Sequence, residues 1–356
     1  MSKTTATTAD DLLDLALRRG ASDLHLEPTA AGLDVRLRVD GHLHRGVRTL
    51  TPGDARAATA RLMSLAGLLS YHPHVPQEGR LDFKPAGAAG PIALRVSVMP
   101  TPHGPRVAVR LPARNGSDSP GGSDGAPALD ALGLPPQTLA ALRRWMAADS
   151  GMLLLIGPAG AGKTTTAHAL LSALAAPALG LSVVSLEDPV ERDLPGVTQI
   201  QIEPFGQLTY AVALRSLLRQ DPQVLGIGEI RDAQTAALAA DAALAGHRLV
   251  TTLHAGNPAR ALVRLTEMGV EPYRVTSGVS AVVGQRLLRR SGGGRVPVAE
   301  AVEMTDTLRR GVIDGLDAAA LDRLCPRDTL HDAAARLIAD GVIDPAEAER
   351  VLGPPC

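Results

Sequence analysis

The sequence predicts an α/β protein with two parts, a small α+β domain followed by a larger domain built on a parallel sheet. From residue 129 onward, short apolar runs alternate with Ala- and Leu-rich segments, as in a parallel sheet whose faces are covered by helices. Before residue 112, apolar and polar residues alternate one by one, as in an antiparallel sheet with one face in water. The two patterns divide the chain.

The first part, residues 1–112, contains both helical and strand patterns. Asp40 and Gly41 follow an alternating run and predict a hairpin turn. We expect helices at residues 10–19 and 52–69 and strands at residues 33–39, 92–98 and 106–111. This part is therefore predicted to be an α+β domain with a half-exposed antiparallel sheet.

A change of composition separates this part from the next. Residues 113–128 are rich in Gly, Ser, Asp and Pro and predict a flexible linker. Residues 129–290 form the parallel-sheet domain. The last region, residues 291–356, starts with a Ser-Gly-Gly-Gly break at 291–294 and is expected to be mostly helical. Strands of the parallel sheet are expected at residues 153–156, 183–186, 224–227 and 249–253.

Composition restricts the class of protein. A chain of 356 residues can form two domains with real cores, and a net charge of −1 gives no general attraction to nucleic acid. Cys325 and Cys356 are too few for a disulfide framework, which fits a reducing cytoplasm. The polar start of the chain lacks the apolar segment of a signal peptide. The uncharged stretch 169–186 is interrupted by Pro177 and Gly180, so a helix end, turn and buried strand is the better interpretation than a membrane span.

A glycine-rich loop lies between the first predicted parallel strand and the helix after it. Its pattern G-x-x-x-x-G-K-T is that of a loop that cradles phosphate groups with backbone N–H groups. We expect Lys163 to reach the β- and γ-phosphates and Thr164 to hold Mg²⁺. The alternative is a glycine-rich turn before an ordinary helix. The loop consists of Gly157, Pro158, Ala159, Gly160, Ala161, Gly162, Lys163 and Thr164, with Thr165 next in the chain.

Three polar side chains follow other predicted parallel strands, at the edge where such sheets bind ligands. Glu187 could deprotonate the attacking water, or cap a turn before Pro189. Glu229 follows an apolar run, where an acid helps to hold Mg²⁺, although Gly228 occupies the usual Asp position. His254 could contact the γ-phosphate, or be structural.

Arginines supply candidates for stabilising charge on a transferred phosphate. Arg215 and Arg219 lie one helical turn apart in the second part, and Arg80 and Arg95 lie in the first. The alternative for each is a solvated surface arginine.

Taken together, these motifs resemble the secretion-superfamily ATPases of type II secretion and type IV pilus machines. The match extends in order over about residues 10–310. It rests on A-S-D-L-H-L-E-P at 21–28, Q-E-G-R at 77–80, the loop at 157–166, E-D-P-V-E at 187–191, L-R-Q-D-P at 218–222, G-E-I-R-D at 228–232, A-G-H at 245–247, L-H at 253–254, E-M-G-V at 267–270 and Q-R-L at 285–287.

The resemblance implies a PAS-like α+β domain, a linker and a RecA-like P-loop ATPase domain with a parallel sheet, followed by a helical tail. It implies a cytoplasmic homohexamer that hydrolyses ATP with Mg²⁺. The ring would act on an inner-membrane platform protein, with membrane association only through partners. It assigns water activation to Glu187, the Walker B role to Glu229 and the histidine box to His254. Arg80 and Arg95 match N-domain arginines that reach nucleotide when the domain closes.

Two departures from the family pattern stand out. The sequence starts at the PAS-like unit without the extra N-terminal docking domain of many relatives, and residues 291–294 replace a four-cysteine element, so no zinc is expected. We therefore expect a compact form, which also resembles pilus retraction ATPases. The Q-E-G-R box at 77–80, S-V-M-P-T at 97–101 and H-G-P-R at 103–106 favour a protein that powers assembly of a pilus or pseudopilus. The alternatives are a pilus retraction ATPase, a RecA-like nucleic-acid translocase, which the near-neutral charge disfavours, and a ring subunit that binds ATP without hydrolysis.

Overall fold

The computed structural model describes residues 3–70, 74–85, 90–111, 126–203, 207–325 and 327–354, with side chains described from residue 9 onward. Contacts within the chain divide it into two compact units, residues 1–118 and 119–356. The predicted linker, 113–128, lies outside the described residues except for its last three positions.

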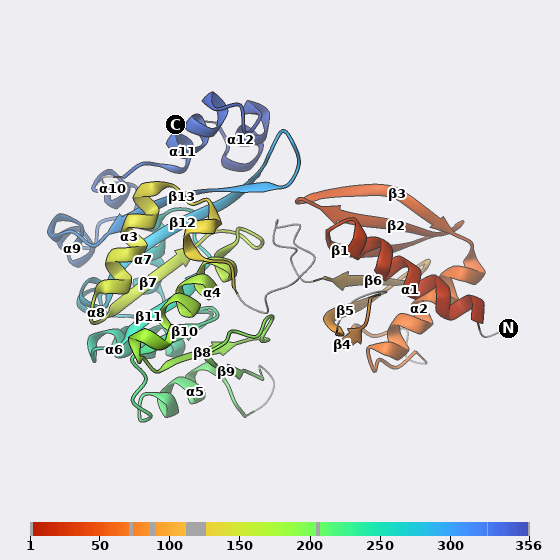
Figure 1. Ribbon diagram of the computed structural model, residues 1–356, viewed down its shortest axis with the longest axis horizontal. Helices are drawn as coiled ribbons and strands as arrows, with labels where there is room; N and C mark the ends of the chain where they lie inside the picture. Colours follow the sequence, from red (N-terminus) through yellow and green to blue (C-terminus); the bar gives the residue numbers. More distant parts are fainter. Residues whose placement is uncertain are drawn as a thin grey trace. The chain divides into compact units, whose positions relative to one another are not determined.

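Unit 1 is a six-stranded antiparallel sheet with two helices (Figure 1). Its strands lie in the order β3-β2-β1-β6-β5-β4. The elements are α1 (Lys3–Arg18), β1 (Ala21–Thr29), β2 (Gly32–Val39), β3 (His42–Leu50), α2 (Pro52–Leu65), β4 (Gln77–Phe83), β5 (Ile92–Thr101) and β6 (Gly104–Arg110). The predicted hairpin is confirmed, because Asp40 and Gly41 connect β2 and β3 with positive φ angles of 47° and 82°.

The core of unit 1 forms where the apolar face of this sheet meets the helices. Leu12, Leu13 and Ala16 of α1 are completely buried, as are Leu24 and Leu26 of β1. In β5 and β6 alternate residues are buried in this core and the others are less buried, which is why the sequence alternates there. Helix α2 begins after Thr51, whose side chain accepts a hydrogen bond from the Asp54 N–H.

Unit 2 is built on a seven-stranded sheet in the order β13-β12-β7-β11-β10-β8-β9. All strand pairs are parallel except β12 with β13. Its elements up to the site edge are η1 (Leu129–Leu132), α3 (Pro136–Ala147), β7 (Gly151–Ile156), α4 (Lys163–Leu174), η2 (Pro177–Leu179), β8 (Val183–Glu187), β9 (Thr198–Gln201), α5 (Tyr210–Leu217), β10 (Val224–Ile227), α6 (Ala233–Leu244) and β11 (Arg248–Leu253). The four predicted parallel strands are confirmed as β7, β8, β10 and β11.

The remaining elements of unit 2 complete the sheet and add helices around it. They are α7 (Pro258–Glu267), α8 (Pro272–Gly278), β12 (Val279–Arg289), β13 (Arg295–Glu303), α9 (Asp306–Ile313), α10 (Ala318–Arg323), α11 (Leu330–Ala339) and α12 (Pro345–Leu352). The region after residue 291 therefore differs from the expectation at its start. It begins with a strand, because residues 291–294 form a turn that returns the chain antiparallel to β12.

Both faces of the parallel sheet are covered. Leu153 and Leu155 of β7 pack in one hydrophobic cluster with residues of α3 and α4. Leu154 and Ile156 of the same strand pack in another with residues of α5, α6 and α7. The carboxyl ends of β7, β11, β10 and β8 lie side by side, so the polar side chains that follow these strands lie at one edge of the sheet.

Candidate functional site

The glycine-rich loop connects the end of β7 to the start of α4. Gly157 lies directly beside β12, where a Cβ atom would come within 2.5 Å of the Gln285 carbonyl oxygen. A Cβ atom on Gly162 would lie 2.6 Å from the Gln285 amide nitrogen. Both positions also have positive φ angles, so the sheet neighbour and the loop conformation both require glycine.

Lys163 is buried at the first position of α4. Its ammonium group donates hydrogen bonds to the carbonyl oxygens of Gly157 and Pro158, at 2.7 Å and 2.9 Å. Burial and the nearby positive charge of Arg286 lower the pKa of Lys163 to about 8. Among the described residues no carboxylate forms an ion pair with Lys163. An anion such as a phosphate group would compensate this charge.

The threonines after Lys163 face different surroundings. Thr164 is exposed in the first turn of α4, so its hydroxyl group is open to a ligand. Thr166 is buried and donates a hydrogen bond to the Gln285 side-chain oxygen, at 2.9 Å.

The next residue of β12, Arg286, reaches the loop after His254. Its guanidinium donates a hydrogen bond to the carbonyl oxygen of Gly256 in that loop, at 3.0 Å. Strand β12 thus contacts both the glycine-rich loop and the histidine loop.

Glu187 ends β8 as a buried carboxylate with three hydrogen-bond donors. Ser185 Oγ and Gln199 Nε2 donate to one oxygen, at 2.6 Å and 2.8 Å. His168 Nε2 lies 3.0 Å from the other. Burial by itself would raise the pKa of Glu187, but hydrogen bonds from His168, Ser185 and Gln199 outweigh it and hold this pKa below its ordinary value. Glu187 is therefore ionised at neutral pH.

Glu229 and His254 lie together after β10 and β11. The His254 Nε2 atom is 3.6 Å from a Glu229 oxygen, and the other Glu229 oxygen accepts from Arg231. Arg231 also pairs with Asp188, at 3.2 Å. The pKa of His254 is lowered by burial and by the charges of Lys163, Arg231 and Arg264, against a raising hydrogen bond with the Gly157 backbone. The structure thus brings His254 to both Glu229 and the glycine-rich loop.

The arginines of unit 1 form a row on the sheet. Arg80 of β4 is directly opposite Arg95 of β5, which in turn is opposite Arg110 of β6. Arg80 lies 3.7 Å from Asp82 and is half exposed. Arg110 is not among the residues predicted from the sequence. It occupies an exposed position of β6, and pairing the strands by their alternation would have placed it beside Arg95. Of the other candidates, Arg219 donates to the Arg215 carbonyl oxygen on α5.

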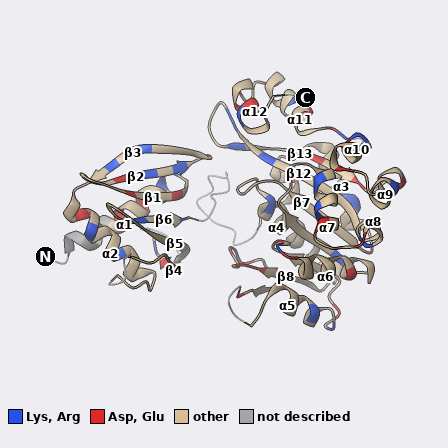
Figure 2. Cartoon of the chain, turned by 180° about the vertical axis from the view of Figure 1, so that it is seen from behind, with Lys and Arg blue, Asp and Glu red and all other residues tan. Residues whose placement is uncertain are grey.

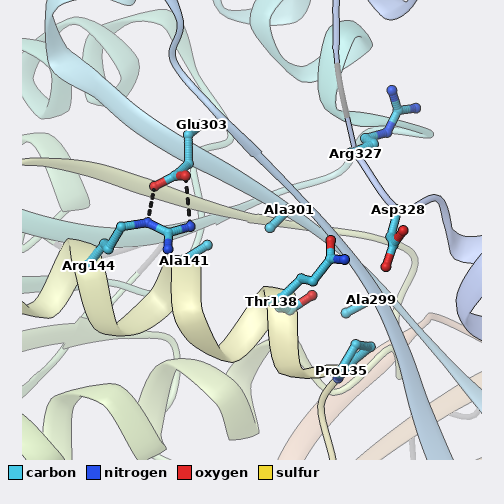
Figure 3. A pocket seen from close by; sticks show the side chains of 10 residues that line it. Pro135, Thr138, Ala141, Arg144, Ala299, Ala301, Glu303, Arg327 and Asp328 are labelled. Carbon is cyan, nitrogen blue, oxygen red and sulfur yellow. Dashed lines mark hydrogen bonds and ion pairs between the residues drawn. The ribbon is translucent and has the colours of Figure 1, made fainter.

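A cavity of about 140 Å³ lies elsewhere in unit 2, between α3, β13 and residues 327–328. Figure 3 shows Arg144 of α3 bound to Glu303 of β13 by two hydrogen bonds, at 2.9 Å and 2.8 Å, beside it. The cavity is lined by Pro135, Gln137, Thr138, Ala141, Arg144, Ala299, Ala301, Glu303, Arg327 and Asp328. It includes none of the predicted site residues, so we do not assign the site to it.

In the part of the chain that the structure describes, no group of three or more His, Cys, Asp or Glu side chains is arranged to hold a metal ion by itself. No helix among the described residues is long and apolar enough to cross a membrane.

Comparison with known proteins places this geometry in a family. The family described as "Type II/IV secretion system protein" matches residues 3–307. Among curated relatives, the type II secretion system protein HxcR of Pseudomonas aeruginosa is 42% identical over 78% of this chain and 57% of its own length. The type IV pilus assembly ATPase PilB of Thermus thermophilus is 38% identical over 77% of this chain and 30% of its own length. The type II secretion system ATPase E of Vibrio cholerae is 37% identical over 78% of this chain and 53% of its own length. The chain spans between about a third and about three fifths of the length of these relatives.

Solved structures support the fold. The Legionella pneumophila ATPase DotB superposes with a TM-score of 0.76 over 97% of this chain and 95% of its own, at 20% identity. The pilus retraction motor PilT with bound ADP gives 0.69 over 97% of both chains, at 24% identity. At these identities the likeness concerns the fold, which is a RecA-like P-loop domain preceded by a smaller α+β domain. Because the family match covers most of the sequence, the predicted resemblance is confirmed, and the chain belongs to the type II/IV secretion system protein family.

Proposed function

We propose that this protein hydrolyses ATP with Mg²⁺ and that hydrolysis powers assembly of a type IV pilus or a type II secretion pseudopilus. One observation carries the proposal. The buried ammonium of Lys163, a carboxylate from each of two strands and His254 gather at the same edge of a parallel sheet. Family membership supports the coupling to secretion or pilus machinery.

The donor set of the site fits a triphosphate and a hard cation. The loop residues 157–165 supply backbone N–H groups, and Lys163 supplies positive charge. Thr164 and Glu229 offer exposed or partly exposed oxygen ligands, the type that Mg²⁺ prefers. When bound, Mg²⁺ would neutralise charge on the β- and γ-phosphates.

The two acids have different roles in this proposal. Glu187 activates the attacking water, and Glu229 acts with Mg²⁺ in the Walker B position. An ionised carboxylate accepts about four hydrogen bonds, and Glu187 receives three within the described residues. One acceptor position of Glu187 is therefore left for a water molecule. His254, held between Glu229 and the Gly157 backbone, responds to the γ-phosphate.

The proposal extends to the assembly in which the chain works. We infer a cytoplasmic homohexamer at the inner membrane that acts on a platform membrane protein. Its domains would be residues 1–112, 129–290 and 291–356, with residues 113–128 between the first two. Arg80 and Arg95 would add positive charge for hydrolysis. Family membership supports these inferences.

Replacement of Lys163 by Ala in the organism that encodes the chain tests the function. Loss of pili or of secreted proteins, at normal protein level, is the expected result. Electron microscopy of the cells and analysis of the medium would measure it. Excess surface fibres would instead identify a retraction ATPase, and unchanged fibres and secretion would contradict both functions.

A further inference from the structure

His168 is a buried histidine that the glycine-rich loop motif does not use. It lies on α4, five positions after Lys163, and is 7% exposed. Its Nε2 atom is 3.0 Å from the Glu187 carboxylate at the end of β8. The contact therefore joins the helix that begins at the loop to the acid at the sheet edge.

Three structural elements hold Glu187 in one orientation. Helix α4 contributes His168, strand β8 contributes Ser185, and edge strand β9 contributes Gln199. An ionised carboxylate only accepts hydrogen bonds, so Nε2 of His168 carries the hydrogen. Hydrogen bonds to a charged group are the stronger kind, and the side chains of His168, Ser185 and Glu187 are all buried.

His168 has a role in this set that Ser185 and Gln199 cannot replace. It binds the second carboxylate oxygen, whereas the other two donors share the first. Without His168 the second oxygen would lose its donor, and the carboxylate could pivot about the oxygen that Ser185 and Gln199 hold. A base must be held in a narrow range of positions to accept a proton efficiently.

We propose that His168 is a positioning residue, which orients the Glu187 carboxylate for hydrolysis and ties that orientation to the helix of the glycine-rich loop. The inference rests on the proposed role of Glu187 in activating water. His168 itself contacts no reacting atom in this proposal and exchanges no proton.

Steady-state kinetics of the full chain with Mg-ATP test the proposal. His168→Phe keeps a ring but removes the donor, and kcat should fall by about 10- to 100-fold, the value of one hydrogen bond to a charged group. KM should change by less than about twofold, because the phosphate-binding groups are untouched. His168→Gln retains an N–H donor and should recover most of kcat.

A matched control is available in the same unit. His331 of α11 contacts the Gly353 carbonyl oxygen through Nε2 at 3.3 Å, away from Glu187. His331→Phe should leave kcat unchanged. If thermal unfolding shows that the phenyl ring of His168→Phe does not fit the site, His168→Leu is the second donorless variant. Unchanged kcat in a folded donorless variant would overturn the proposal.

A double mutant separates positioning from packing. In a Glu187→Gln background there is no base to orient, so His168→Phe should cause no further loss of kcat. A loss as large as in the wild-type background would mean that His168 only supports the fold, and the proposal would be wrong.

The Glu187 titration gives a readout that needs no turnover. A ¹³C-carboxyl signal that disappears in Glu187→Gln reports this group, and its pKa should rise in His168→Phe because a lowering hydrogen bond is lost. His168 is the titratable neighbour that contacts Glu187, since Ser185 and Gln199 do not titrate. An unchanged pKa would overturn the proposal, whereas absence of turnover in the wild-type chain with the expected pKa rise would instead refute the proposed function.

Discussion

The two sheets of this protein place charged side chains in opposite ways. All six residues of β7 in the parallel sheet are buried, because helices cover both faces. In β5 of the antiparallel sheet, buried Leu94, Val96 and Val98 alternate with less buried residues. Charged groups are therefore absent from β7, whereas they lie in rows across a face of the antiparallel sheet, as the blue stretches on β2 and β3 in Figure 2 illustrate.

Replacing arginines on the exposed face of the antiparallel sheet should have the largest effect on ATP turnover among substitutions that test one sheet alone. Arg80→Ala and Arg95→Ala should lower ATP turnover in the full chain, by up to the factor of about 10³–10⁵ known for arginines that stabilise a transferring phosphate. Arg45→Ala, an exposed arginine of β3, is the matched control and should have no effect. Turnover would be measured after checking hexamer formation by mass.

A different outcome would assign these arginines to the surface. If intact hexamers of both variants turn over ATP at the wild-type rate, Arg80 and Arg95 make only surface ion pairs such as Arg80 with Asp82. Such pairs contribute roughly 0–1 kcal/mol to stability.

The edge of the parallel sheet gives the next largest effect. Glu187→Gln should still bind ATP but hydrolyse it about 10²–10⁴-fold more slowly, because a general base is lost. Single-turnover hydrolysis and nucleotide retention on filters would measure this. If Glu229→Gln instead traps ATP while Glu187→Gln remains active, the roles of the two acids are reversed.

The cores of the two sheets should respond differently to neighbouring substitutions. Leu154→Ala and Leu155→Ala in β7 should each cost about 2–5 kcal/mol of unfolding free energy, because both side chains are buried. In β5, Leu94→Ala should cost a similar amount, because Leu94 is buried. Arg95→Ala should change the free energy of unfolding by less than about 0.5 kcal/mol, because Arg95 is exposed. Urea unfolding would test this, and equal costs at Leu94 and Arg95 would contradict the alternation.

The same contrast explains which elements the sequence predicts. Strands β7, β8, β10 and β11 are continuous apolar runs, and this pattern predicts all four. Strand β12 is not predicted, because Gln285 and Arg286 interrupt its apolar pattern. They are tolerated there because Gln285 bonds to Thr166 and Arg286 to backbone carbonyl oxygens. The region after residue 291, which is predicted to be mostly helical, begins with β13, which pairs antiparallel with β12.

The site shows a similar division. The loop motif and the acids at strand ends can be found from residue type and spacing. The contact of His168 with Glu187 cannot, because the two residues lie 19 positions apart and meet only when α4 packs on the sheet. Arg231 contacts both Glu229 and Asp188. The sequence shows Arg231 only as a member of the G-E-I-R-D motif, because its contact with Asp188 forms only when the loops after β8 and β10 meet.

ATP turnover by the purified full chain, with and without Mg²⁺, tests the central claim most directly. The wild-type chain should hydrolyse ATP only with Mg²⁺, and Lys163→Ala should abolish turnover while remaining folded by circular dichroism. Lys84→Ala, which removes an exposed lysine of unit 1, should behave as wild type. Near-wild-type turnover in Lys163→Ala would contradict the assignment of the glycine-rich loop as the ATP site.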